Sequence, residues 1–112
     1  MNFKLEQING CQVLSILDER IDAHNSADLK AELLQLIEQH GGAIVVQLEQ
    51  VRFIDSSGLG ALLSGHKQAV AKSGKLVLVK IQQPVLAMFE ITRLNRVFEI
   101  YADLDEASAA QT

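Results

Sequence analysis

The sequence predicts one α/β domain built on a mixed β-sheet, with the element order ββαβαβαβα over residues 1–112. Three observations lead to this class. The chain has 112 residues, of which 48% are hydrophobic, as expected for a single globular domain. Alternating side chains on both sides of an Asn-Gly turn at residues 9–10 predict an N-terminal hairpin. Beyond it, short apolar runs alternate with helical periodicity, which is typical of strands joined by crossover helices.

The first half of the chain contains the hairpin, a helix and a strand. Residues 3–8 and 11–17 are the two predicted hairpin strands. After the polar residues 18–24, either Asn25 or Ser26 is expected to cap a helix that ends at Gly41-Gly42. In residues 43–48, apolar side chains occupy both odd and even positions and so would point to both faces of a sheet. This predicts a central strand that is covered on both faces. The helix repeats apolar residues at i, i+4, i+7 and i+8, and these are Leu29, Leu33, Leu36 and Ile37.

A second helix is predicted to start just after Asp55 and to end near Ser73-Gly74. The next apolar run, residues 76–81, is a strand, and the strand-helix-strand unit implies a parallel crossover. We expect the helix to bury four apolar side chains, namely Leu59, Leu62, Leu63 and Val70.

The last third of the chain is predicted to contain two further helices and one strand. Pro84, the only proline, suits the first turn of a helix, and residues 97–101 can form an edge strand. Asp103 and Glu106 have the spacing of a capping box for a final helix. Its alanine-rich tail, residues 107–112, is expected to fray.

Composition and charge exclude several classes of function. The formal net charge of −4 argues against DNA or RNA as a partner, because nucleic-acid binding needs clustered Lys and Arg. Apolar runs such as residues 43–46 are far shorter than the roughly 18 residues of a membrane span. Residues 1–8 lack the pattern of a secretory signal, which favours a cytoplasmic location. The single cysteine, Cys11, has no intramolecular disulfide partner and is interpreted as a core residue.

No catalytic motif emerges. Gly58-x-Gly60 could open a dinucleotide-binding turn, but Leu63 stands where the third small residue should be. A nucleotide-binding enzyme that uses these two glycines is therefore a weak alternative, since no lysine, metal ligand or base accompanies them. The three histidines form no i, i+4 pair and no cluster with cysteine, so no metal site or cofactor is expected. His66 falls on the apolar face of its helix, where a partly buried, hydrogen-bonded histidine is expected.

The segment Phe53 to Gly60, FIDSSGLG, carries the functional signal. Asp55 can accept hydrogen bonds from the open amides of the first helical turn. Capping alone does not require Ser56, Ser57 and two glycines there, because glycine costs about 1 kcal/mol relative to alanine in a helix. These small residues leave the backbone accessible, which suits docking by another protein.

Asp55-Ser56-Ser57-Gly58-Leu59-Gly60 followed by an Ala-Leu-Leu run resembles the phosphorylation segment of STAS-domain anti-sigma factor antagonists. The similarity extends over nearly the whole chain and implies a compact STAS-like domain. It implies phosphorylation of Ser57, with Ser56 as the alternative site. An aspartate just before the first helix also recurs in such proteins, and Asp22 has that place. The family usually has a glycine shortly before it, whereas this chain has Asp18-Glu19-Arg20.

The resemblance implies a partner switch without catalysis by the domain itself. The unphosphorylated protein would bind an anti-sigma factor that is also a serine protein kinase, and a PP2C-like serine phosphatase would reverse the phosphorylation of Ser57. The residues expected to contact the partner are Asp22, Asp55, Ser56, Ser57, Gly58, Leu59 and Gly60. An alternative within the same fold is a STAS-type adaptor subunit of a transporter or of a larger signalling assembly.

Overall fold

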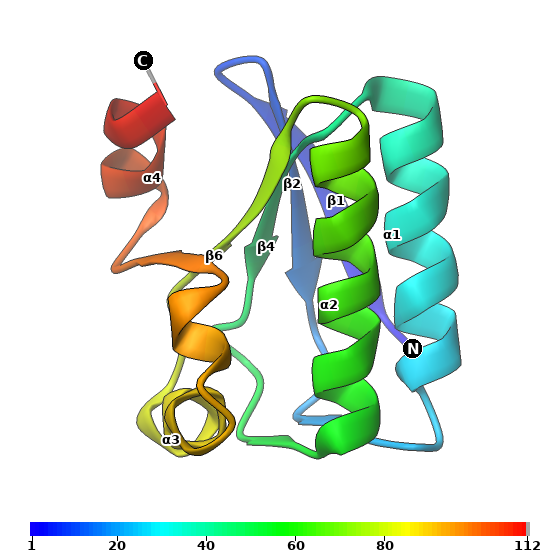
Figure 1. Ribbon diagram of the computed structural model, residues 1–112, viewed down its shortest axis with the longest axis vertical. Coiled ribbons are helices and arrows are strands. Elements are labelled where there is room, and N and C mark those ends of the chain that lie inside the picture. Colours follow the sequence, from blue (N-terminus) through cyan, green and yellow to red (C-terminus); the bar gives the residue numbers. More distant parts are fainter. Residues whose placement is uncertain (112) are drawn as a thin grey trace.

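A five-stranded mixed sheet forms the centre of the computed structural model, which describes the backbone of residues 1–111 and the side chains of residues 1–109 (Figure 1). The strand order is β1-β2-β4-β6-β7. The predicted central strand is indeed in the middle, and the predicted edge strand is at the edge. The bounds are β1 Phe3–Ile8, β2 Cys11–Ile16, β4 Ala43–Gln47, β6 Lys75–Val79 and β7 Glu99–Tyr101.

Strands β1 and β2 form the predicted antiparallel hairpin, with Phe3 opposite Ile16. Asn9 and Gly10 both have positive φ values, 52° and 81°, as a two-residue type I′ hairpin turn requires. The remaining neighbours are parallel, as the crossover connections demand. The sheet is therefore mixed, with the antiparallel pair β1–β2 at its N-terminal edge.

Helices α1 (Ser26–His40) and α2 (Ser56–Ala71) lie side by side on one face of the sheet (Figure 1). The main core lies between them and the strands and includes all four predicted residues of α1. Helix α3 (Gln83–Ile91) and the short 3-10 helix η1 (Leu94–Arg96) follow β6. Helix α4 (Leu104–Gln111) packs on the opposite face, where Ala107 belongs to a second core cluster with Val13, Val45, Val77 and Val79.

Three details differ from the sequence prediction. Two short strands, β3 (Arg20–Ile21) and β5 (Phe53–Ile54), pair with each other outside the main sheet, and neither was predicted, nor was η1. Val70 is 54% exposed rather than buried, because it lies on the side of α2 that faces away from α1, at the border of the helix layer that α1 and α2 form. Leu59 and Leu62 are buried as expected, and Leu63 is partly buried.

The C-terminal helix begins as the capping-box spacing predicts, because the backbone N–H of Glu106 donates to Oδ1 of Asp103 at 2.8 Å. The backbone is helical to Gln111, and Thr112 lies outside the described residues, so fraying of residues 107–112 stays a prediction. Among the helices that the structure describes, none has the length and hydrophobicity needed to cross a membrane.

Candidate functional site

Asp55 caps the N-terminus of α2, as the sequence predicts. Its backbone is extended, and its side chain accepts a hydrogen bond from the backbone N–H of Gly58 at 3.0 Å. The carbonyl oxygen of Asp55 also accepts the first helical hydrogen bond, from the N–H of Leu59 at 3.0 Å. The backbone amides of Ser56 and Ser57 precede any internal helical partner, so the start of α2 presents open N–H groups.

The short strands β3 and β5 fasten a second segment against this helix start. Arg20 pairs with Phe53 and Ile21 with Ile54, and the N–H of Asp55 donates to the carbonyl oxygen of Ile21 at 3.1 Å. The Asp22 loop, as named below, is the segment of residues 18–25, which includes β3 and leads into α1. It is thereby held beside Asp55, so the structure brings the two separated parts of the predicted site together.

Gly58 is needed for this contact. A Cβ atom at this position would lie 2.7 Å from Cγ2 of Ile21 and 2.7 Å from Cγ1 of Ile54, closer than van der Waals contact allows. The glycine therefore lets α2 start directly against the β3–β5 pair. Gly60 is different, because an added Cβ there would meet nothing within 4 Å.

The Asp22 loop is organised by hydrogen bonds of Asp22 and Asn25. Oδ1 of Asn25 accepts from the N–H of Asp22 at 2.9 Å, and its Nδ2 donates to the carbonyl of Arg20 at 2.8 Å. Asn25, one of the two expected residues, occupies the N-cap of α1 and its carbonyl accepts from the N–H of Leu29, but its side chain makes no capping hydrogen bond. The side chain instead ties the loop together.

The carboxylate of Asp22 is held in its ionised form. The backbone N–H of His24 donates to its Oδ1 at 3.0 Å, and the side chains of His24 and Arg20 each lie 3.5 Å from a carboxylate oxygen. The backbone hydrogen bond is the main cause that lowers the pKa of Asp22 below its usual range, and the nearby His24 and Arg20 add to it. This site therefore already bears a negative charge near the start of α2.

Both predicted phosphate acceptors, Ser56 and Ser57, are exposed. Ser57, Ala61 and Gly65 succeed one another at i, i+4 spacing and so share one side of α2. A Cβ at Gly65 would lie 2.9 Å from Cδ1 of Leu33, which identifies this side as the one that faces α1. Ser57 is therefore turned toward α1 and the loop that leads into it, whereas Ser56 shares the outward side with Gly60.

The seven predicted partner-contacting residues divide by exposure. Ser56, Ser57 and Gly60 are exposed, and Asp22 and Asp55 are partly exposed. Gly58 and Leu59 are buried, so they shape the surface from beneath it.

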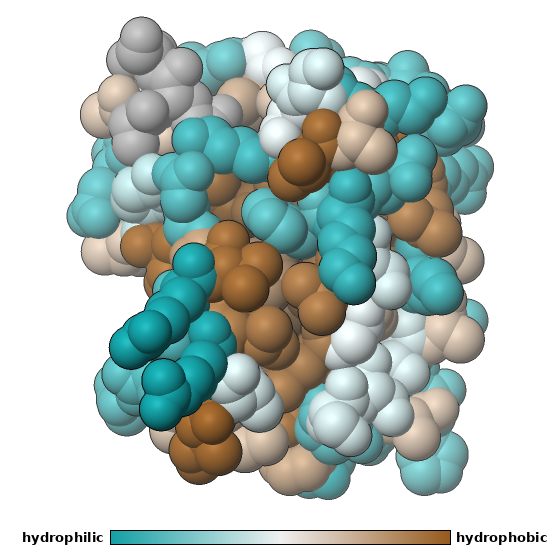
Figure 2. All heavy atoms as spheres, in the orientation of Figure 1, coloured by the Kyte–Doolittle hydropathy of each residue, from teal (hydrophilic) through white to brown (hydrophobic). Residues whose placement is uncertain are grey.

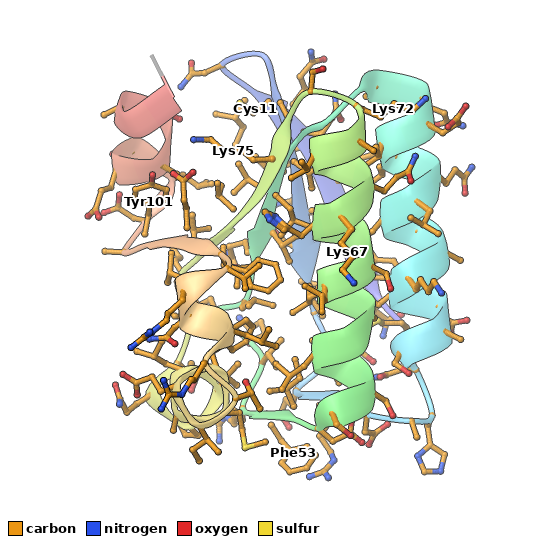
Figure 3. The ribbon with its side chains drawn as sticks, viewed as in Figure 1. Cys11, Phe53, Lys67, Lys72, Lys75 and Tyr101 are labelled. Atoms are coloured by element: carbon orange, nitrogen blue, oxygen red, sulfur yellow. The ribbon has the colours of Figure 1, made fainter. Side chains whose placement is uncertain are left out.

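Two exposed residues beside this surface, Arg20 and Phe53, were not among the predicted partner-contacting residues. The guanidinium of Arg20 lies 4.0 Å from the ring centroid of Phe53, and Phe53 is 41% exposed. Figure 3 shows Phe53 at the end of the molecule where α2 begins. A two-residue strand is too short for its alternation to be recognised, so only the pairing of β3 with β5 reveals this contact.

The missing glycine before Asp22 leaves no visible distortion. Non-glycine residues with positive φ are Asn9, Ser73, Lys80 and Arg93 within the described residues, and none of them is in the Asp22 loop. The carbonyl of Glu19 accepts from the backbone N–H groups of both Arg52 and Phe53. The segment Asp18-Glu19-Arg20 therefore adopts an ordinary backbone that glycine is not required to form.

The histidines do not build a metal site. Over the residues that the structure describes, no group of three or more His, Cys, Asp or Glu side chains could hold a metal ion. His66 is partly buried, with its ring centroid 5.1 Å from that of Phe98. The expectation that it is hydrogen-bonded is wrong for Nδ1, which is buried without a partner in the described part of the chain.

Comparison with known proteins decides the family. The STAS domain family model matches residues 2–107. The chain belongs to the STAS domain family. Among its relatives, an anti-sigma-B factor antagonist of Bacillus subtilis (strain 168) is 30% identical over 82 residues, which are 73% of this chain and 74% of that protein. An anti-sigma F factor antagonist of Paenibacillus polymyxa is 28% identical over 103 residues, which are 90% and 88% of the two chains.

Solved structures share this STAS fold. The anti-sigma factor antagonist SpoIIAA in its unphosphorylated form matches with a TM-score of 0.73 at 21% identity, over 98% of this chain and 96% of that one. Bacillus SpoIIAA in its phosphorylated form matches with a TM-score of 0.70 at 23% identity, over 98% of both chains. A sulfate transporter family protein from Wolinella succinogenes matches with a TM-score of 0.78 at 17% identity, over 92% and 85%. The predicted family and fold are thus confirmed.

Proposed function

We propose that this STAS domain is a cytoplasmic anti-sigma factor antagonist whose partner binding is switched by phosphorylation of Ser57. The unphosphorylated domain binds an anti-sigma factor, which releases the sigma factor, and phosphorylated Ser57 prevents this binding. The observation that carries the proposal is an exposed serine in the first turn of α2, beside the fastened Asp22 loop. The relatives named anti-sigma factor antagonists support it, as do the two phosphorylation forms of SpoIIAA.

The domain contributes a hydroxyl group to the phosphoryl transfer and no catalytic machinery. Oγ of Ser57 forms a bond to the γ-phosphorus of ATP while the bond to the bridging oxygen breaks and ADP leaves. The hydroxyl proton passes to a base of the kinase. A PP2C-like serine phosphatase restores the hydroxyl by hydrolysis and releases inorganic phosphate.

The orientation of the two serines favours Ser57 over Ser56 as the acceptor. Ser57 lies on the side of α2 that faces α1, whose N-terminus follows directly on the Asp22 loop. A kinase that recognises both segments would meet Ser57 between them. Ser56 is turned toward Gly60 and away from the loop.

The phosphate acts on the interface rather than on the fold. It adds about −1.5 to −2 charges to a surface that already carries Asp22 and Asp55. The open amides and the helix dipole at the start of α2 favour a negative group, so the domain tolerates it. A partner that buries this surface would have to desolvate the added charge. Such a charge costs several kcal/mol when it is poorly paired, which is a loss of roughly 100-fold or more in affinity.

Peptide mass spectrometry after incubation with the cognate anti-sigma factor kinase and ATP tests the proposal. We expect a single phosphate on Ser57 and loss of binding to that kinase after full modification. Modification of Ser56 would reverse the assignment of the site, and tight binding by the fully phosphorylated protein would overturn the switch.

A second candidate function is an adaptor domain in a transporter or in a larger signalling assembly. The fold match to the Wolinella succinogenes sulfate transporter family protein favours it. The two candidate functions differ in whether partner binding depends on phosphorylation of Ser57 by a kinase. Phosphorylation of Ser57 that abolishes binding of an anti-sigma factor supports the switch, whereas stable binding to a transporter regardless of Ser57 phosphorylation supports the adaptor.

A further inference from the structure

The cations of this acidic protein are unevenly paired. Of its ten Lys and Arg residues, Lys4, Arg20, Arg52, Lys72, Lys75 and Lys80 each form an ion pair with a carboxylate. Within the described residues no such pair is found for the other four, Lys30, Lys67, Arg93 and Arg96. Three of these four, Lys67, Arg93 and Arg96, flank a single hydrophobic surface between α2 and η1.

This surface, called the α2 groove below, lies between two helical walls. Figure 2 shows hydrophobic atoms in the hollow between α2 and the segment of α3 and η1. On one side, Leu63, His66 and Val70 recur along one edge of α2 at i, i+3 and i+7. The other side is η1 with the two residues after it, Val97 and Phe98, and the contact of His66 with Phe98 joins the two sides. The lining residues are Leu63, His66, Val70, Leu94, Val97 and Phe98.

The groove exists because the helix layer ends at α2. Helices α1 and α2 cover the sheet as far as β6, and the edge strand β7 contacts η1 and α4 instead. Val70 is 54% exposed, Val97 is 43% exposed, and Leu63 and Leu94 are only partly buried. Contiguous apolar surface of this kind on a protein of net charge −4 is typical of an interaction site.

The cations lie at the borders of the same groove. Lys67 stands on α2 between Leu63 and Val70, at i+4 from the first and i−3 from the second, and projects to solvent (Figure 3). Arg93 precedes η1 and Arg96 ends it, so both flank Leu94. The groove therefore has an apolar floor, with positive charge on both rims that no carboxylate of the described chain neutralises.

We propose that the α2 groove binds an amphipathic helix of a protein partner whose apolar stripe is flanked by Asp and Glu. A helix laid beside α2 would extend the existing helix layer at the usual interaxial distance of about 8–10 Å. Its carboxylates would pair with Lys67 on one rim and with Arg93 and Arg96 on the other. The groove begins at Leu63, six residues and about 9 Å beyond Ser57 along α2, so we expect this contact to be separable from the phosphorylation switch.

Two synthetic helical peptides test the proposal with the full-length chain. Both have the same leucine stripe over about four turns, and one carries Glu and the other Lys at every flanking position. Fluorescence anisotropy should show that the Glu peptide binds at least about tenfold more tightly. Its amide shift changes in NMR spectra should lie at residues 63–70 and 94–98. In the variant Arg93→Glu/Arg96→Glu the preference should reverse toward the Lys peptide.

Matched variants separate the groove from other effects. Lys30→Glu changes the fourth cation without an ion pair in the described part of the chain, which lies elsewhere, on α1, and should leave the preference intact. Val70→Asn/Val97→Asn changes two exposed side chains and should weaken both peptides. Ser57→Asp should leave peptide binding within about twofold, so failure of the phosphorylation switch and failure of the groove can be told apart.

Several results would overturn the proposal. Equal binding of both peptides, no saturable binding of the Glu peptide, or shift changes centred on Ser56 and Ser57 would each do so. Self-association that Val70→Asn abolishes in sedimentation experiments would make a second copy the occupant. Binding to anionic vesicles that Arg93→Glu/Arg96→Glu abolishes, without Glu peptide binding, would make a membrane the occupant.

Discussion

The backbone N–H of Asp55 donates to the carbonyl oxygen of Ile21 at 3.1 Å and so joins the start of α2 to the Asp22 loop. The contact lies between backbone atoms, so it is maintained by how closely the two segments approach. Gly58 sets that approach, because its missing side chain leaves room for Ile21 and Ile54. The geometry of the candidate site thus depends on a buried glycine next to the exposed serines.

The first prediction compares the two glycines of the motif. Gly58→Ala should lower the free energy of unfolding by about 1–3 kcal/mol, because the new methyl group overlaps Ile21 and Ile54. Gly60→Ala should instead raise it by up to about 1 kcal/mol, since the position is open and alanine favours the helix. Urea unfolding of both variants measures the difference. Equal changes in the unfolding free energy of the two variants would mean that the structure has room for a methyl group at Gly58.

The second prediction concerns the cap. Asp55→Ala should cost about 0.5–2 kcal/mol of stability and weaken binding of the cognate anti-sigma factor, while the domain stays folded. Asp55→Asn keeps an acceptor for the N–H of Gly58 and should retain most of the stability. Circular dichroism and binding measured on the same preparations check both variants. Unchanged affinity in Asp55→Ala would remove Asp55 from the interface.

The third prediction concerns the switch itself. Ser57→Ala should abolish phosphorylation and retain partner binding, because the loss of one exposed hydroxyl is a small change. Ser57→Asp should bind more weakly than Ser57→Ala, since it adds charge, though less than a phosphate does. Ser56→Ala is the matched control and should still be phosphorylated. Calorimetry with the anti-sigma factor separates these cases, and equal affinity of the Ala and Asp variants would argue against an electrostatic switch.

The fourth prediction compares side chains on α2. Leu62 is fully buried, so Leu62→Ala should cost about 2–5 kcal/mol in urea unfolding. Val70→Ala should change the unfolding free energy by no more than about 0.5 kcal/mol, because that side chain is more than half exposed. A large loss in Val70→Ala would mean that the end of α2 is covered.

The fifth prediction follows from the lowered pKa of Asp22. Stability that comes from this carboxylate is present above its unfolded pKa of about 3.9, and it is lost as the pH falls through the lower folded value. The stability difference between the wild type and Asp22→Asn should therefore disappear below that pH. His24→Ala keeps the backbone N–H, which is the main cause, so an NMR titration should still find the pKa of Asp22 lowered. A return to the usual value would assign the effect to the imidazole.

The main sheet and its helices could be predicted because their signals are local. The turn at Asn9-Gly10, the cap at Asp55 and the two-sided hydrophobicity of residues 43–48 each act within a few neighbouring positions. The exposure of Val70 could not be foreseen, because it depends on where the layer of helices ends rather than on the apolar pattern of α2 itself.

The candidate site was predicted only in part for a related reason. Its serines, aspartates and glycines are recognisable as a motif, but the role of Asn25 and the contact of Arg20 with Phe53 depend on pairing between distant segments. A strand of two residues, such as β3 or β5, is too short to show the alternation of apolar and polar side chains by which strands are predicted. The same holds for the three cations of the α2 groove that have no carboxylate partner among the described residues, because Lys67 is far in sequence from Arg93 and Arg96.

The β3–β5 pair has a consequence for the timing of folding. It joins residues on either side of α1 and β4, so it forms only after both have been synthesised and brought together. Contacts between residues so far apart in sequence form later and more slowly than those within a hairpin or a helix. A nascent or partly folded chain therefore exposes Ser57 without the adjoining loop, and a partner that requires both segments will recognise finished molecules alone.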